Sequence, residues 1–144
     1  MDEIRALLAK AEIAELITRY AARSDAGDWE AVAQLYTEDG RMSRPVAPTV
    51  FIAGRAAILE SLRSRPPRAA RHIVGNILVS LTDEAHASAS SQILLYTGTA
   101  ANDGGLPLLS ATAPLIGTYQ DTLVNAGGGW RFAERRGSLD FRAP

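Results

Sequence analysis

Residues 70–81 read ARHIVGNILVSL, and this stretch decides the fold class of the chain. Its β-branched and other apolar residues are typical of a buried β-strand. Strand alternation assigns His72, Val74, Asn76 and Leu78 to one face and Ile73, Gly75, Ile77 and Val79 to the other. Both faces are mostly apolar, whereas an antiparallel sheet in a small monomer usually leaves one face in water. We therefore expect one face to cover helices and the other to cover a second subunit of a homodimer or homotrimer.

Further strands are predicted after this stretch, at residues 86–98, 108–125 and 129–141. Asp83-Glu84 suits a turn before the first of these strands, and the AGGG run at residues 126–129 suits a turn before the last. Long strands joined in this way predict a curled antiparallel sheet.

The residues before this stretch have helical patterns instead. Apolar residues recur at three- and four-residue steps in residues 3–24, namely Ile4, Leu7, Leu8, Ala11, Ala14, Ile17 and Ala21. Asp28 can cap a second short helix that runs to Tyr36, and a third helix fits residues 54–62 before Pro66-Pro67. Between them we expect only a short strand near Met42 and a proline-broken loop. Helices first and strands afterwards predict an α+β domain.

The composition is typical of one globular domain spanning residues 1–144, with 47% hydrophobic and 22% charged residues. The net charge of −1 argues against nucleic acid as a partner, because phosphate binding needs clustered Lys and Arg. No segment approaches the roughly 20 apolar residues that span a bilayer. The first residues lack the pattern of a signal peptide, so we expect a cytoplasmic protein and no membrane partner.

His72 is a titratable ring in a stretch that otherwise indicates buried sheet, and Asp25 stands where the first helical pattern ends. An aspartate beside an imidazole makes a general base, so we hypothesise that these two residues meet. The alternative is that His72 is an ordinary strand histidine and that Asp25 only terminates the helix. His86 has polar neighbours and an ordinary setting. Cysteine is absent, and the two histidines lack helical spacing, so we expect no metal site.

Several short segments, in this order, resemble a SnoaL-like domain of the nuclear transport factor 2-like superfamily. They are YAARSDAGDWEA at residues 20–31, LYTEDG at 35–40, GRAAI at 54–58, RHIVGN at 71–76, GTYQD at 117–121 and GWRF at 129–132. The resemblance implies a cone-shaped barrel, in which a strongly curved, mainly antiparallel sheet wraps around a long N-terminal helix with two further helices. It also implies a deep pocket between helix and sheet.

Within that superfamily the chain resembles the branch of scytalone dehydratase, hexachlorocyclohexane dehydrochlorinase and bile-acid dehydratase. This resemblance implies an aspartate–histidine pair that removes a proton from carbon without metal or organic cofactor, and the matching residues are Asp25 and His72. Tyr20 matches a position that lends a polar catalytic group in several members. The dehydrochlorinase pattern has a lysine where this chain has Tyr20, which argues against halide elimination.

Other residues are assigned from strand alternation and from their positions in the family. Tyr36, Met42, Asn76 and Tyr119 are expected to line the pocket, although ordinary core packing is an equally good interpretation of each. Tyr20 has the same alternative, because a tyrosine at core spacing usually buries its ring. We assign Trp29 to the core, and Arg135 and Arg136 mainly to the surface or an interface, with the alternative that Arg136 faces the pocket.

These observations predict a cofactor-independent lyase of the dehydratase type, or an isomerase. Its substrate would be a small, largely apolar molecule, either ring-bearing or polyketide-like. The alternative is a small-molecule-binding module without chemistry of its own, or the small subunit of a ring-hydroxylating oxygenase.

Overall fold

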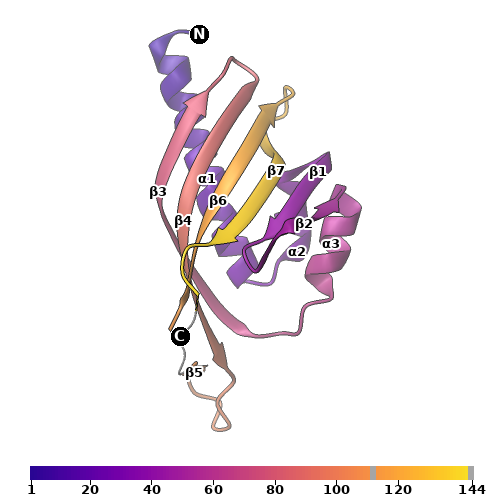
Figure 1. Cartoon of the computed structure of the whole chain (residues 1–144), viewed down its shortest axis with the longest axis vertical. Helices are drawn as coiled ribbons and strands as arrows, with labels where there is room; N and C mark the ends of the chain where they lie inside the picture. The colour runs from indigo at the N-terminus through magenta and orange to yellow at the C-terminus, as the bar shows by residue number, and fades with distance from the viewer. Residues whose placement is uncertain (111–112, 143–144) are drawn as a thin grey trace.

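The computed structural model describes residues 1–110 and 113–142, which form three helices and a seven-stranded sheet. The helices are α1 (Glu3–Asp25), α2 (Trp29–Gln34) and α3 (Arg55–Arg63). The strands are β1 (Tyr36–Arg44), β2 (Ala47–Ala53), β3 (Ala69–Leu81), β4 (His86–Thr99), β5 (Leu108–Leu109), β6 (Leu115–Asn125) and β7 (Trp130–Leu139). The predicted α+β class with a long first helix is confirmed (Figure 1).

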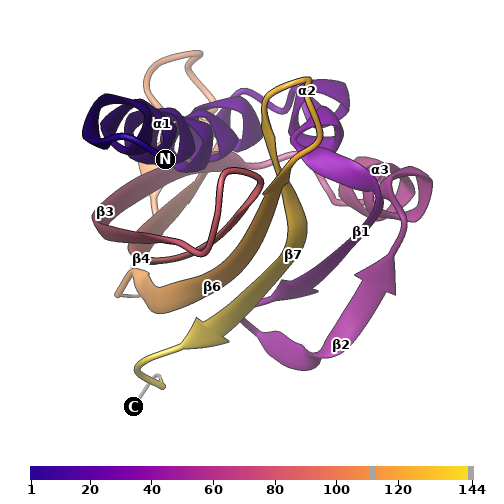
Figure 2. The same ribbon diagram turned by 90° about the horizontal axis from the view of Figure 1, so that it is seen from above.

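The sheet has the order β2-β1-β7-β6-β4-β3, with β5 paired to β4. Every pairing is antiparallel except the parallel one between β1 and β7, so the sheet is mixed but mainly antiparallel. Figure 2 shows that the sheet curves around the side on which α1 lies. Helix α1 contacts β3 and β7, which places its C-terminal half inside the curve. This is the cone that the resemblance implied.

The buried stripe of helix α1 shares Ile17 with the stripe that the periodicity predicted, but its other residues differ. Its buried residues are Ala9, Ile13, Leu16, Ile17 and Tyr20, whereas Ile4, Leu7 and Leu8 in the first turns are exposed. The stabilisation from burial grows with apolar area, and in the part of α1 that has buried residues the predicted stripe offers only Ala11 and Ala14 beside Ile17. The stripe with Ile13, Leu16 and Tyr20 offers more area and therefore faces the sheet.

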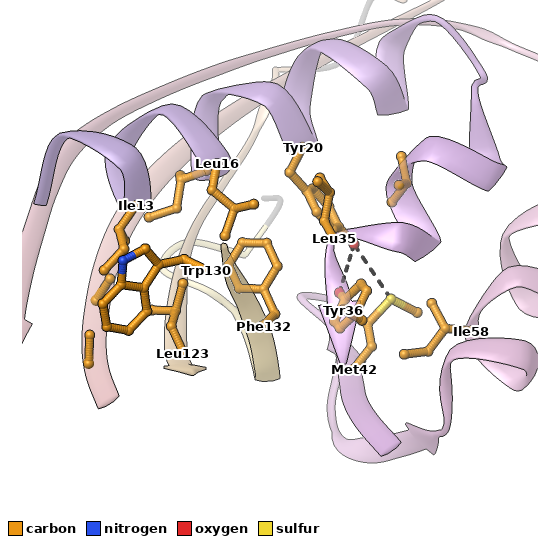
Figure 3. Packing of buried hydrophobic residues seen from close by; sticks show 14 of the residues in the cluster. Ile13, Leu16, Tyr20, Leu35, Tyr36, Met42, Ile58, Leu123, Trp130 and Phe132 are labelled. Atoms are coloured by element: carbon orange, nitrogen blue, oxygen red, sulfur yellow. Dashed lines mark hydrogen bonds between the residues drawn. The ribbon is translucent and has the colours of Figure 1, made fainter. Parts of the chain in front are cut away.

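The main core lies between α1 and the sheet. Ile13, Leu16 and Tyr20 of α1 pack toward Phe132 and Trp130 of β7, as Figure 3 shows. The remaining labelled members of the cluster are Leu35, Tyr36, Met42, Ile58 and Leu123. Trp29, which we assigned to the core, is only partly buried and packs at the edge of this cluster.

Strand β3 contains a β-bulge that changes the predicted alternation. Its register against β4 shifts between Gly75 and Leu78, and Asn76 adopts a positive φ of 49°. Asparagine tolerates this left-handed conformation better than most residues. The extra residue returns Ile77 to the inner face, and Leu78 is 70% exposed instead of inside. The predicted grouping of Asn76 and Leu78 with His72 and Val74 on one face is therefore wrong.

Three predicted boundaries also differ. Tyr36 opens β1 instead of ending α2, and the proline-broken loop contains strand β2, where Pro48 is tolerated because β2 lies at the edge of the sheet. The strand predicted at 108–125 is divided into β5 and β6, and its residues 111–112 lie outside the described part of the chain. In that described part, no helix combines the length and apolar character needed to cross a membrane.

Candidate active site

A cavity of about 520 Å³ opens beside the C-terminal end of α1. Its wall is formed by the end of α1, the β1–β2 and α3–β3 connections, and parts of β1, β3, β4, β6 and β7. This volume is in the range of pockets that enclose small organic molecules. Tyr20, Asp25 and His72 all line it.

Asp25, the last residue of α1, meets His72 on β3. Its Oδ1 lies 2.5 Å from His72 Nδ1, and its Oδ2 accepts a hydrogen bond from the backbone N–H of His72 at 2.9 Å. The side chains are 7% and 16% exposed, respectively. Both carboxylate oxygens are thus engaged by one residue, which fixes the ring in one orientation. With Nδ1 held by the carboxylate, Nε2 is the nitrogen available to a molecule in the cavity.

This contact joins residues 47 positions apart, and the packing of α1 against β3 creates it. A carboxylate at Nδ1 selects the tautomer with the proton on Nδ1 and stabilises the imidazolium that forms when Nε2 takes a proton. The arrangement can therefore act as a general base.

Tyr20 projects from α1 into the core and also lines the cavity. Its hydroxyl lies 2.9 Å from the Tyr36 hydroxyl and 3.6 Å from the Met42 sulfur, as the dashed lines in Figure 3 show. Burial raises the pKa of Tyr36 well above its ordinary value, so this phenol stays protonated. Because a phenol can both donate and accept, the hydrogen-bonded pair of hydroxyls can orient a donor towards a bound molecule.

The four predicted pocket residues have different positions. Met42 and Tyr119 line the cavity, whereas Tyr36 is fully buried behind Tyr20 and does not line it. Asn76 does not line it either, because the bulge turns this residue outwards, where its amide donates to the Gln92 side chain at 2.5 Å. Burial raises the pKa of Tyr119 to about 12, so its hydroxyl also remains neutral.

Arg135 is the residue that the sequence analysis placed most wrongly. Its side chain is 1% exposed, and its Nε lies 3.1 Å from Oδ1 of the buried Asp121. Its guanidinium carbon lies 3.7 Å from the ring centroid of Tyr119 and 4.3 Å from that of Tyr20. Burial raises the pKa of Asp121 to about 6, while the guanidinium acts in the opposite direction. The pair thus places a buried guanidinium, with its carboxylate partner, against the rings of the two cavity tyrosines.

A second bulge explains this error. The register between β6 and β7 shifts, so that Leu123 pairs with Phe132 but Thr122 pairs with Glu134. Simple alternation from the buried Phe132 would point Arg136 inwards; the extra residue points Arg135 inwards and leaves Arg136 exposed.

Sequence reasoning also missed Ser43, which lines the cavity next to Met42. Its hydroxyl is buried and has no hydrogen-bond partner among the described residues. No motif marks this serine, and only the adjacent Met42 hints at its position. In residues 1–110 and 113–142, no three His, Cys, Asp or Glu side chains gather as metal ligands would.

Comparisons with solved structures agree with this architecture. A protein from Novosphingobium aromaticivorans provisionally named scytalone dehydratase has a TM-score of 0.80 at 23% identity, over 99% of this chain and 95% of that one. A nuclear transport factor 2-like protein with a cystatin-like fold, from the same organism, has a TM-score of 0.78 at 25% identity, over 95% and 85% of the two chains.

A third structure from that organism, provisionally named an aromatic ring hydroxylase, has a TM-score of 0.78 at 19% identity, over 96% of this chain and 93% of that one. The first and third of these similarities concern the fold alone. No curated protein matches the chain.

The sequence profile of the SnoaL-like domain matches residues 5–136. This match spans all but the first two residues of the helices, the Asp25–His72 contact and all but the end of the sheet. The chain therefore belongs to the SnoaL-like domain family.

Proposed function

We propose that the protein is a cofactor-independent lyase of the dehydratase type, or an isomerase, and that Asp25 and His72 form its general base. The observation that supports this most strongly is the contact of His72 Nδ1 with the Asp25 carboxylate at the wall of a cavity. The substrate would be a small, largely apolar molecule, ring-bearing or polyketide-like.

In the proposed reaction, Nε2 of His72 takes a proton from a substrate carbon. Asp25 keeps the reactive tautomer in place and stabilises the resulting imidazolium, while low exposure strengthens the attraction between the two charges. The electron pair of the broken C–H bond forms a new double bond to the neighbouring carbon.

The fate of that electron pair distinguishes the two reactions. In a dehydration, a hydroxyl leaves from the neighbouring carbon and takes a proton from an acid, so that water is released. In an isomerisation, the electrons move onto a carbonyl oxygen, and the imidazolium returns its proton to another carbon. Tyr20 suits the role of donor in both, because it lines the cavity and its hydroxyl is hydrogen bonded to the hydroxyl of Tyr36.

The test begins with a substrate found by screening ring-bearing alcohols and ketones for turnover. The variants Asp25→Asn and His72→Gln are expected to lower kcat by about a hundred- to ten-thousandfold while remaining folded, since a positioned base contributes that much. Tyr20→Phe tests the acid and should lower kcat less.

The chain itself offers a matched control. His86 also has its Nδ1 against an aspartate, Asp83, at 2.9 Å, but both side chains are exposed at the β3–β4 turn. His86→Gln should therefore leave kcat unchanged. Full turnover in folded Asp25→Asn and His72→Gln would remove the proposal and leave the alternative of a binding module or oxygenase small subunit, which the cavity alone would support.

A further inference from the structure

Four arginines line the cavity in addition to the residues of the proposed reaction. Arg44 ends β1, and Arg63, Arg65 and Arg68 come from the end of α3 and the connection to β3. The side chain of Arg63 is paired with Glu30 and is thereby neutralised. The other three have no ion-pair partner in residues 1–110 and 113–142.

The acidic residue of the cavity wall does not balance these charges. Asp25 is the acid among the lining residues, and both of its carboxylate oxygens are engaged by His72. The cavity wall therefore carries a net positive charge, although the chain as a whole has a net charge of −1. The excess is local to the site.

Arg65 is not a freely solvated surface arginine. It is half-buried, its Nε is buried without a hydrogen-bond partner in the described residues, and its guanidinium carbon lies 5.9 Å from the ring centroid of Trp29. Burial and the nearby charges of Arg44 and Arg68 lower the pKa of its guanidinium. Leaving a buried donor unpaired among like charges is costly, and an anion in the cavity would remove that cost.

We propose that the substrate carries an oxyanion group, such as a carboxylate, sulfonate or phosphate, on an otherwise apolar body, and that Arg65 binds this group together with Arg44 and Arg68. A guanidinium offers a planar fork of donors that matches two oxygens of such a group. Apolar lining residues including Ile93, Leu95 and Leu115 suit the body of the same molecule. The inference deepens the proposed function and rests on it only in taking this cavity as the substrate site.

Two fluorescent probes that differ only in one negatively charged group measure how much that group contributes to binding. Anilinonaphthalene sulfonate and N-phenylnaphthylamine share one ring system, and only the former has a sulfonate. Fluorescence titration of the wild-type chain should give a lower Kd for the sulfonate, and this advantage should shrink in high salt because ions screen the arginines. The neutral probe should respond little to salt.

The variant Arg65→Gln should weaken binding of the sulfonate about tenfold or more, since hydrogen bonds to charged groups are the strong ones. In the triple variant Arg44→Gln, Arg65→Gln and Arg68→Gln, the sulfonate probe should no longer bind with a lower Kd than the neutral probe. Arg71→Gln is the matched control, because Arg71 is exposed, unpaired in the described residues and absent from the cavity wall. It makes the same change of charge and should leave both Kd values unchanged.

Three results would overturn the inference: no saturable binding of the sulfonate, equal Kd values for the two probes, or a loss in Arg71→Gln as large as in Arg65→Gln. These outcomes are independent of turnover, because the probes report binding alone. Asp25→Asn and His72→Gln should retain sulfonate binding even if they lose kcat. A failure of the proposed base and a failure of the proposed anion site can therefore be told apart.

Discussion

At the residue scale, Arg135 is a charged side chain that lies almost fully buried in the interior. Its charge is compensated by Asp121 at 3.1 Å and by the faces of Tyr119, Tyr20 and Phe132. Breaking a buried pair is much more costly than replacing both members with apolar residues, because the remaining charge loses its partner. This asymmetry gives a direct test of the pair.

The variant Arg135→Met should lower the free energy of unfolding by about 3–5 kcal/mol, measured by urea denaturation. Adding Asp121→Leu should recover much of that loss. The neighbouring Arg136→Met is the control; Arg136 is exposed, so its replacement should change stability by about 0.5 kcal/mol or less. Equal losses in Arg135→Met and Arg136→Met would contradict the burial of this guanidinium.

Tyr119 gives the fold a predictable response to alkali. Its pKa is raised from 10.0 to about 12 in the folded state, so the folded protein keeps a proton that the unfolded chain releases above pH 10. Rising pH therefore favours unfolding between these two values, by about 1 kcal/mol from pH 10 to about pH 11 for this residue. Urea denaturation at both pH values should show a smaller loss in Tyr119→Phe than in the wild type. An unchanged pH dependence in that variant would show that Tyr119 does not carry this effect.

At the scale of the element, the bulge in β3 decides which side chains of the strand face inwards. Asn76 holds the left-handed conformation with φ of 49° at the point where the register shifts. His72 and Val74 before the bulge and Ile77 and Val79 after it share the inner side, although their sequence parity differs.

Replacing Asn76 with a β-branched residue should therefore be costly. Asn76→Val is expected to lower the free energy of unfolding by roughly 1–3 kcal/mol, because valine is strained at positive φ, whereas Asn76→Gly should be nearly neutral. Ser80→Val, at an exposed and regular position of the same strand, is the control and should be tolerated. Thermal unfolding of the three variants provides the comparison. If Asn76→Val matched Ser80→Val, the bulge would carry no such constraint.

The two bulges also show what the sequence could and could not predict. The type of each element followed from periodicity, because a helix or strand has enough residues for its apolar repeat to remain visible despite one irregular position. A single inserted residue reverses the facing of everything after it. Gly75 and Asn76 are residue types that can mark the first shift, but they do not fix its position, and no turn residue marks the shift before Glu134. For this reason Asn76 was placed inside and Arg135 outside, while the helices and most strands were correct to within a few residues.

At the scale of the whole molecule, the meeting of Asp25 with His72 is a tertiary event that no local pattern encodes. The hypothesis of that meeting came from the setting of each residue and from the family resemblance. The structure places the two side chains in contact, and their catalytic role is the proposal that the variants test. The arginines of the cavity wall were not recognised, because their two segments are remote in the sequence and become neighbours only when the sheet curls.

The outer face of the sheet leads to a prediction about assembly. Ile73 and Leu78 on β3 are 52% and 70% exposed. Apolar side chains of this size on one face favour association of copies of the chain, and we predict a homodimer or homotrimer. Ile73→Lys together with Leu78→Lys should yield a folded monomer in sedimentation. A wild-type mass equal to one 15.4 kDa chain at micromolar concentration would contradict the prediction.

The residues that line the cavity come partly from packed helices and strands and partly from connections and a strand end. Asp25 and His72 are anchored in a helix and a strand, whereas Arg65 and Arg68 are supplied by a connection and Arg44 by the final residue of β1. Connections tolerate insertions and exchanges that packed elements do not. The residues proposed to bind the anion are therefore freer to change among related sequences, or in a laboratory selection, than the proposed base of Asp25 and His72.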